Sequence, residues 1–142
     1  MGFLSPQQRA ALAASSRDDA GGAPLSSFAS PPGGDGKRQR VRRLAGSPTP
    51  AIRESAALSH HAPDDVLTAL AGDRVASVRC CVARNERTPG PTLRLLASDE
   101  EPLVRGWVAA NAASPVELRE SLAADPDDAV RAVVAWAGRW RR

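Results

Sequence analysis

A period of 26 residues constrains the fold of this chain more than any other feature. Four copies of one pattern begin at the pairs Leu44-Ala45, Leu70-Ala71, Leu96-Ala97 and Leu122-Ala123. Eight and nine positions later, each copy has a β-branched residue and an arginine: Ile52-Arg53, Val78-Arg79, Val104-Arg105 and Val130-Arg131. An alanine follows at the thirteenth position: Ala57, Ala83, Ala109 and Ala135. Such a period predicts a solenoid, in which each unit buries its apolar face only by stacking on its neighbours.

Each copy begins with a predicted helix whose apolar residues lie four positions apart, as Val104 and Val108 do. Its predicted N-caps are polar side chains that accept hydrogen bonds from the first amides: Ser47, Asp73, Asp99 and Asp125. The first three of these helices are predicted to end at Ser59, Asn85 and Asn111. Asparagine tolerates the left-handed conformation that is common at helix ends.

A second, shorter helical piece is predicted to start at Pro63, Pro89 and Pro115. Ser114 and Glu117 fit a capping box, while Gly90 and Pro91 favour a 3₁₀ turn in the second copy. The predicted fold is therefore all-α: a short right-handed α-solenoid of about four 26-residue helical repeats, alternating α and short or 3₁₀ helices, with a flexible N-terminal arm.

The domain organisation follows from local composition. Ser5 and Pro6 predict the start of a short N-terminal helix within residues 1–17. Residues 18–36 are rich in Gly, Pro and Ser and predict a flexible linker. Residues 37–142 are the predicted repeat solenoid, with a basic N-terminal cap and a Trp-rich C-terminal cap. Trp136 and Trp140 lie four apart and are expected to cover the open end of the stack.

The net charge of +3 is unevenly distributed, because residues 1–43 carry +4 and residues 44–142 carry −1. Five cations lie close together: Lys37, Arg38, Arg40, Arg42 and Arg43. One interpretation is the solvated face of a capping helix whose Val41 and Leu44 point inward. The other is a polyanion contact, which gains affinity by releasing counterions from phosphates. The near-neutral solenoid argues against strong phosphate binding.

Cysteine usage and hydropathy indicate the compartment. The two cysteines, Cys80 and Cys81, are adjacent in a predicted helix, so we expect reduced thiols, one in the core and one half-buried. No apolar run is long enough to cross a bilayer, and residues 1–17 lack the pattern of a signal peptide. We expect a cytoplasmic protein that does not bind membranes.

The repeated columns over residues 44–137 resemble those of the leucine-rich repeat variant family. The matching residues in the last copy are Asp125-Pro126, Val130-Arg131 and Val134-Ala135. The resemblance implies an α-solenoid, similar in style to HEAT repeats, with alternating α and 3₁₀ helices and a concave surface. The period of 26 is a little longer than is usual for that family. An iron–sulfur cluster held by N-terminal cysteines in one member has no counterpart here, since no cysteine precedes Cys80. No cofactor is expected.

The most regular polar feature is one arginine per copy, here called the arginine ladder: Arg53, Arg79, Arg105 and Arg131. A row of guanidinium groups suits phosphate or carboxylate ligands. The alternative is structural: each arginine pairs with Asp73, Asp99 or Asp125 of its own or a neighbouring copy, or with carbonyls at helix ends. Because every ladder arginine follows a core residue, a half-buried structural position is favoured.

Trp107 replaces Ser55, Cys81 and Val133 of the other copies, which makes it a candidate ligand contact. His60-His61 is interpreted as a surface pair, because a metal site needs three or four converging ligands. No Ser-His-Asp arrangement, phosphate-binding glycine loop or HExxH motif is present.

We therefore predict a non-catalytic module that binds another protein through the solenoid surface. The alternative is binding of DNA or RNA through Lys37–Arg43, the arginine ladder and the Arg139–Arg142 cluster. An enzyme similar to the HEAT-like DNA glycosylases is a third class, for which only Trp107, Asp99 and Arg105 resemble the required aromatic and acidic groups.

Overall fold

The structure is a computed structural model that describes Gln7 and residues 35–140. It divides into two compact units, Met1–Gly33 and Gly34–Arg142. The predicted N-terminal helix, apart from Gln7, and the predicted linker up to residue 34 lie outside the described residues. Residues 35–140 form eight helices and no strand, which confirms the all-α prediction for this part of the chain. The helices are α2 (Asp35–Ala45), α3 (Pro50–Ala57), α4 (Asp64–Leu70), α5 (Ala76–Arg84), α6 (Gly90–Leu96), α7 (Pro102–Ala110), α8 (Val116–Leu122) and α9 (Asp128–Arg139).

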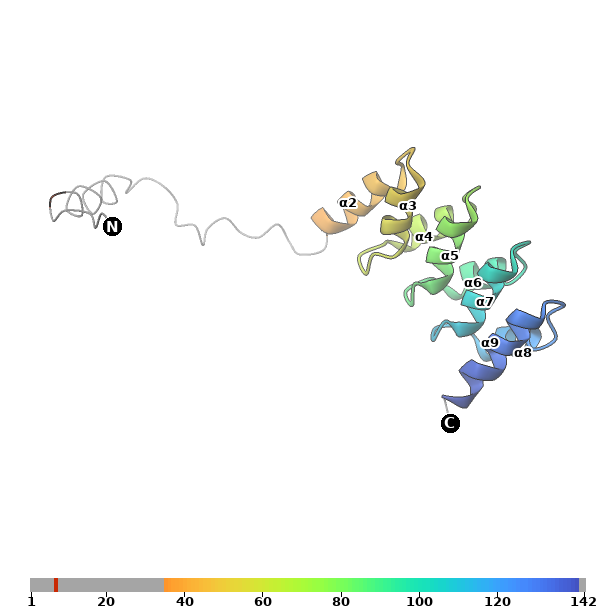
Figure 1. Cartoon of the computed structure of the whole chain (residues 1–142). Coiled ribbons are helices and arrows are strands. Elements are labelled where there is room, and N and C mark those ends of the chain that lie inside the picture. The colour runs from red at the N-terminus through yellow and green to blue at the C-terminus, as the bar shows by residue number, and fades with distance from the viewer. Residues whose placement is uncertain (1–6, 8–34, 141–142) are drawn as a thin grey trace. The chain divides into compact units, whose positions relative to one another are not determined.

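Two kinds of helix alternate along the chain. Helices α2, α4, α6 and α8 each end within a repeated Leu-Ala pair, and α3, α5, α7 and α9 carry the repeated arginines. The arginine-bearing helices pack in chain order, α3 on α5, α5 on α7 and α7 on α9. Figure 1 shows the resulting row of helices from α2 to α9. The repeated arginines, 26 positions apart, therefore lie on helices that pack directly against one another.

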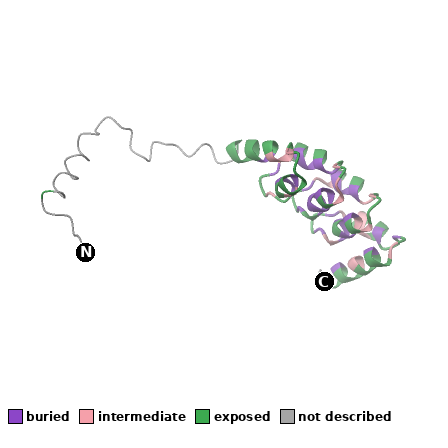
Figure 2. Ribbon diagram, turned by 45° about the horizontal axis from the view of Figure 1, so that its top comes forward, coloured by how far each residue is buried: buried purple, intermediate pink, exposed green. Residues whose placement is uncertain are grey.

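The core is aliphatic and lies between these helices, as the buried positions of Figure 2 show. Its largest fully buried side chains are Leu67, Leu93, Leu96, Val78, Val82, Val104, Val108 and Val130. Ala57, Ala83 and Ala109 are completely buried, so only a small side chain fits where successive helices meet. In α2, Val41 is buried and Leu44 packs against the core, as the capping-helix interpretation expected.

The predicted N-caps of the arginine-bearing helices are wrong by two residues. The observed N-caps are Thr49, Val75, Glu101 and Asp127, and among them only the Asp127 side chain accepts helix amides. Asp73, Asp99 and Asp125 instead accept the backbone N–H two residues ahead, from Val75, Glu101 and Asp127 at 2.9 Å each. A short acidic side chain closes a turn in this way before an extended residue begins the helix.

The shorter helices begin as predicted, with Pro63, Pro89 and Pro115 directly before α4, α6 and α8. The expected 3₁₀ turn in the second copy is wrong, because α6 is an α-helix of seven residues whose Pro91 lies in the first turn, where no N–H is needed. The capping box at Ser114 is also absent, since the Ser114 hydroxyl donates to the Val108 carbonyl oxygen. Asn85 and Asn111 are extended rather than left-handed.

Candidate functional site

Three rungs of the arginine ladder are bidentate ion pairs between neighbouring copies. The Nε atoms of Arg53, Arg79 and Arg105 lie 2.7 Å from Oδ2 of Asp73, Asp99 and Asp125, respectively. In each pair a second bond joins Nη2 to Oδ1, at 3.1, 3.0 and 2.9 Å. Nη1 of each arginine donates to a backbone carbonyl of its own copy, at Ser47, Asp73 or Asp99. The pairing with Asp73, Asp99 and Asp125 that one of the two interpretations predicted is therefore present.

Hydrogen bonding keeps the aspartates of these pairs ionised although burial opposes it. The aspartate side chains are only 9, 8 and 4% exposed at Asp73, Asp99 and Asp125. Hydrogen bonding by the arginine lowers the pKa of Asp73 and Asp125. At Asp99, burial works to raise the pKa, but the Arg79 guanidinium and the Glu101 amide together outweigh it, so this pKa is lowered too. These three arginines therefore join neighbouring copies through largely buried ion pairs.

The fourth rung differs. Arg131 Nη1 donates to the Asp125 carbonyl oxygen at 2.6 Å, as in the other copies, but Nη2 donates to Asp128 on its own helix. The Arg131 side chain is 41% exposed, against 10 to 12% for the other three arginines. Among the described residues, no carboxylate from another copy contacts it.

Acid should unfold the protein through the three buried aspartates. A pKa that folding lowers contributes stability that is complete above the ordinary aspartate pKa of about 3.9 and is lost as pH falls through the folded value. We expect the melting temperature, measured by circular dichroism, to fall by several degrees between pH 6 and pH 3. Asp99→Asn should flatten this slope and the exposed Asp64→Asn should not. Equal slopes for both variants would contradict the assignment.

A second polar ladder, which sequence reasoning missed, is built from Asn85 and Asn111. The Asn85 amide Nδ2 donates to the carbonyl oxygens of Ala57 at 2.7 Å and Ser59 at 3.1 Å. The Asn111 Nδ2 donates to those of Ala83 at 2.7 Å and Asn85 at 3.0 Å. Both asparagines are buried, so each satisfies the helix end of the preceding copy. The sequence did contain a sign of this ladder, because Asn85 and Asn111 are asparagines at the same position of two successive copies.

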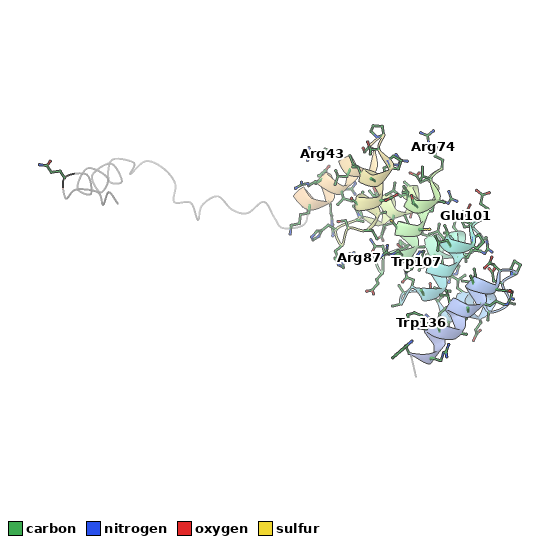
Figure 3. The ribbon with its side chains drawn as sticks, in the orientation of Figure 1. Arg43, Arg74, Arg87, Glu101, Trp107 and Trp136 are labelled. Carbon is green, nitrogen blue, oxygen red and sulfur yellow. The ribbon has the colours of Figure 1, made fainter. Side chains whose placement is uncertain are left out.

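Trp107 lies on α7 beside α5 and is 36% exposed. The guanidinium carbon of Arg84, the last residue of α5, lies 4.7 Å from the Trp107 ring centroid, over its face. Figure 3 shows the Trp107 side chain on the helical stack, with Trp136 further toward the C-terminal end. An exposed ring that carries a stacked guanidinium offers a partner both apolar area and hydrogen-bond donors.

The expected capping role of Trp136 and Trp140 is not realised in the described part of the chain. Their side chains are 54 and 76% exposed, and with Arg139 they line a surface pocket. Val130 and Ala137 are the buried residues of α9. Because residues four apart share a face of a helix, the two tryptophans lie together on a different face of α9 from the one that meets the core.

The five basic residues of α2 are solvent-exposed. Arg42 Nη2 lies 3.1 Å from Asp65 Oδ1 on α4, and this hydrogen bond lowers the pKa of Asp65. Both interpretations of this segment remain compatible with its geometry, because Val41 anchors the helix while the cations face solvent.

The remaining titratable candidates, the histidine pair and the cysteine pair, do not form part of a larger cluster of ligating side chains in the described part of the chain. His60 and His61 are exposed, as expected. Cys80 and Cys81 are both buried, so the expectation of one half-buried thiol is wrong, and burial raises the pKa of both. Across residues 35–140, no three His, Cys, Asp or Glu side chains gather in a way that could hold a metal ion.

Comparisons with family models, with curated proteins and with solved structures each return no match. None of the described helices is long and apolar enough to cross a membrane.

Proposed function

We propose that this chain is a right-handed α-solenoid of four repeats, similar to the leucine-rich repeat variant family, that binds another protein and catalyses no reaction. The repeats would be the pairs α2–α3, α4–α5, α6–α7 and α8–α9. Support comes from the recurrence of the same Arg–Asp and Asn–carbonyl contacts 26 residues apart. Each contact joins one copy to the next, as stacking of repeats requires.

The surface around Trp107 and Arg84 is the proposed protein-binding site. The observation that carries this proposal is the exposed Trp107 ring with Arg84 stacked on it, at a column where the other copies have Ser55, Cys81 and Val133. The core does not require an indole there. Tryptophan and arginine are the residue types most enriched where truncation weakens protein complexes strongly.

The absence of catalysis is part of the same proposal. The chemically reactive thiols, Cys80 and Cys81, are buried and have raised pKa values, which disfavour the thiolate. The aspartates with lowered pKa values that border the core are held by arginines. Among the described residues, the aspartates are therefore paired and the thiols are enclosed in the core.

Nucleic-acid binding is the second candidate, and the exposed cations of α2 favour it. The internal pairing of Arg53, Arg79 and Arg105 removes three of the cations that this function would use. Binding of a mixed-sequence oligonucleotide through α2 would weaken steeply with salt. It would also weaken when Lys37, Arg38, Arg40 and Arg43 are changed together to glutamine.

Loss of the Trp107 ring should weaken protein binding by about 30-fold, equivalent to about 2 kcal/mol. Partners would be captured from lysate with the full chain and identified by mass spectrometry, and Kd values would then be measured by calorimetry. Trp107→Ser supplies the residue of the first copy, and Trp140→Ala is the matched control at another exposed tryptophan.

The melting temperatures of Trp107→Ser and Trp140→Ala should each stay within a few degrees of that of the parent protein. Equal Kd values for the parent protein and Trp107→Ser would remove this surface from the proposal. Binding that depends on the α2 cations and disappears at moderate salt would favour the nucleic-acid candidate instead.

A further inference from the structure

The end of the helical row formed by α8 and α9, here called the α8–α9 end, exposes positions that are buried in every preceding copy. Ala57, Ala83 and Ala109 are completely buried, whereas the equivalent Ala135 is exposed. Val82 and Val108 are completely buried, whereas Val134 is only partly buried. The difference has one physical source: at the other levels the next arginine-bearing helix covers this face, and no described helix covers it on α9.

A pocket lies at this end. Its apolar lining comes from Val116 of α8, from Ala123 directly after α8, and from Val134, Ala137 and Gly138 of α9, and Arg119 and Glu120 also line it. Arg131 precedes Val134 by one helical turn, so both residues lie on the same side of α9. The α8–α9 end thus offers aliphatic surface next to a cation.

The three preceding copies indicate what this cation accepts. Arg53, Arg79 and Arg105 each hold a carboxylate from the loop of the next copy through Nε and Nη2. At Arg131, Nη2 instead contacts the exposed Asp128 three residues earlier. An exposed pair on one helix contributes little, so a carboxylate from outside can replace it.

We propose that the α8–α9 end binds an acidic helical segment of another protein. Its aspartate pairs with Arg131 as Asp73, Asp99 and Asp125 pair with the preceding arginines. The helix that follows this aspartate packs its aliphatic face on Val134 and Ala135. This surface is separate from the one around Trp107, and the partner chemistry is specified by the chain's own repeated contacts.

A second copy of this chain fits the α8–α9 end poorly. The opposite end of the row presents Ile52, 38% exposed, beside Leu44, Arg40, Arg43 and Ser47. Ser47 takes the place that Asp73, Asp99 and Asp125 have in the later copies. Head-to-tail stacking would therefore bring Arg131 toward two arginines without an aspartate, and like charges disfavour that contact.

The test uses the full chain and a fluorescent peptide with the sequence of residues 96–111 carrying Trp107→Ser. This peptide contains the loop aspartate Asp99 and the helix that covers α5 in the protein. We expect saturable binding by fluorescence anisotropy. Binding should weaken at least tenfold with Arg131→Gln in the protein or Asp99→Asn in the peptide, and the two changes together should add little to either alone.

Two matched variants complete the design. Arg74→Gln removes an exposed arginine elsewhere and should leave peptide affinity unchanged, as should Trp107→Ala, which tests the other surface. Absence of binding, or equal binding of the Asp99→Asn peptide, would overturn the proposal. Concentration-dependent dimerisation in sedimentation experiments that Arg131→Gln abolishes would also overturn it, in favour of a second copy.

Discussion

Replacing Arg79 with alanine should lower the free energy of unfolding by about 2–3 kcal/mol. The substitution removes both hydrogen bonds to Asp99 and the bond to the Asp73 carbonyl oxygen. It leaves the Asp99 carboxylate, only 8% exposed, without its counter-ion. Breaking a fully buried pair in this way costs about 3–5 kcal/mol. The expected loss is smaller because the pair borders solvent. Urea denaturation followed by circular dichroism measures it.

The ladder contains its own control for this prediction. Arg131 has the same position in its copy but is 41% exposed and pairs only within its own helix and loop. Arg131→Ala should therefore change the free energy of unfolding by no more than about 0.5 kcal/mol. Equal losses for Arg79→Ala and Arg131→Ala would mean that the contacts between copies contribute nothing. A double-mutant cycle with Asp99→Ala separates the pair itself from the effect of an orphaned carboxylate.

Replacing Asn111 with alanine should cost about 2 kcal/mol, because it removes the side-chain donor of the buried Ala83 carbonyl oxygen and leaves the Asn85 carbonyl oxygen with only the Thr88 amide. Asn111→Asp should be worse at pH 7, since a carboxylate would face the same two carbonyls in a buried site. Burial raises the pKa of such a carboxyl group. The loss relative to the parent protein should therefore shrink as pH falls from 7 toward 5, as the introduced group becomes protonated.

Ser59 provides the comparison for Asn111, because it is the equivalent residue of the first copy. Its hydroxyl oxygen accepts the His61 amide at an exposed site. Ser59→Ala should therefore change stability by no more than about 0.5 kcal/mol. If Asn111→Ala and Ser59→Ala melt at the same temperature, the asparagine contacts between copies are not stabilising.

Much of the helical part of the chain was predictable from the sequence because its signals are local. The starts of α4, α6 and α8 follow from prolines, which lack an N–H and suit the first turn of a helix. The buried valines of α5 and α7 follow from their spacing of four. The starts of the arginine-bearing helices were misplaced, because an aspartate before a helix can serve equally as an N-cap or as a turn residue bonded to another copy.

The candidate site was predictable only as a set of alternatives. Arginine pairing with Asp73, Asp99 or Asp125 was one interpretation of the ladder, and binding of an external anion was the other. The choice depended on contacts between each arginine and an aspartate 20 positions later. The residue types alone do not show whether an arginine side chain points toward that aspartate or toward solvent. The exposure of Trp136 and Trp140 was missed for a related reason: residues four apart share a face, but spacing does not say which face meets the core.

The sequence by itself determined which residues are equivalent, because a period of 26 is a property of the chain before any contact forms. It also determined the helical class, through local propensity and apolar spacing. Only the tertiary structure decided what each equivalent residue does. Arg79 is enclosed because α7 follows α5, and Arg131 is open because no described helix follows α9, although both arginines occupy the same position in the repeat. Because the neighbouring copy determines whether a side chain is buried, an arginine at the same repeat position is enclosed in one copy and exposed in another.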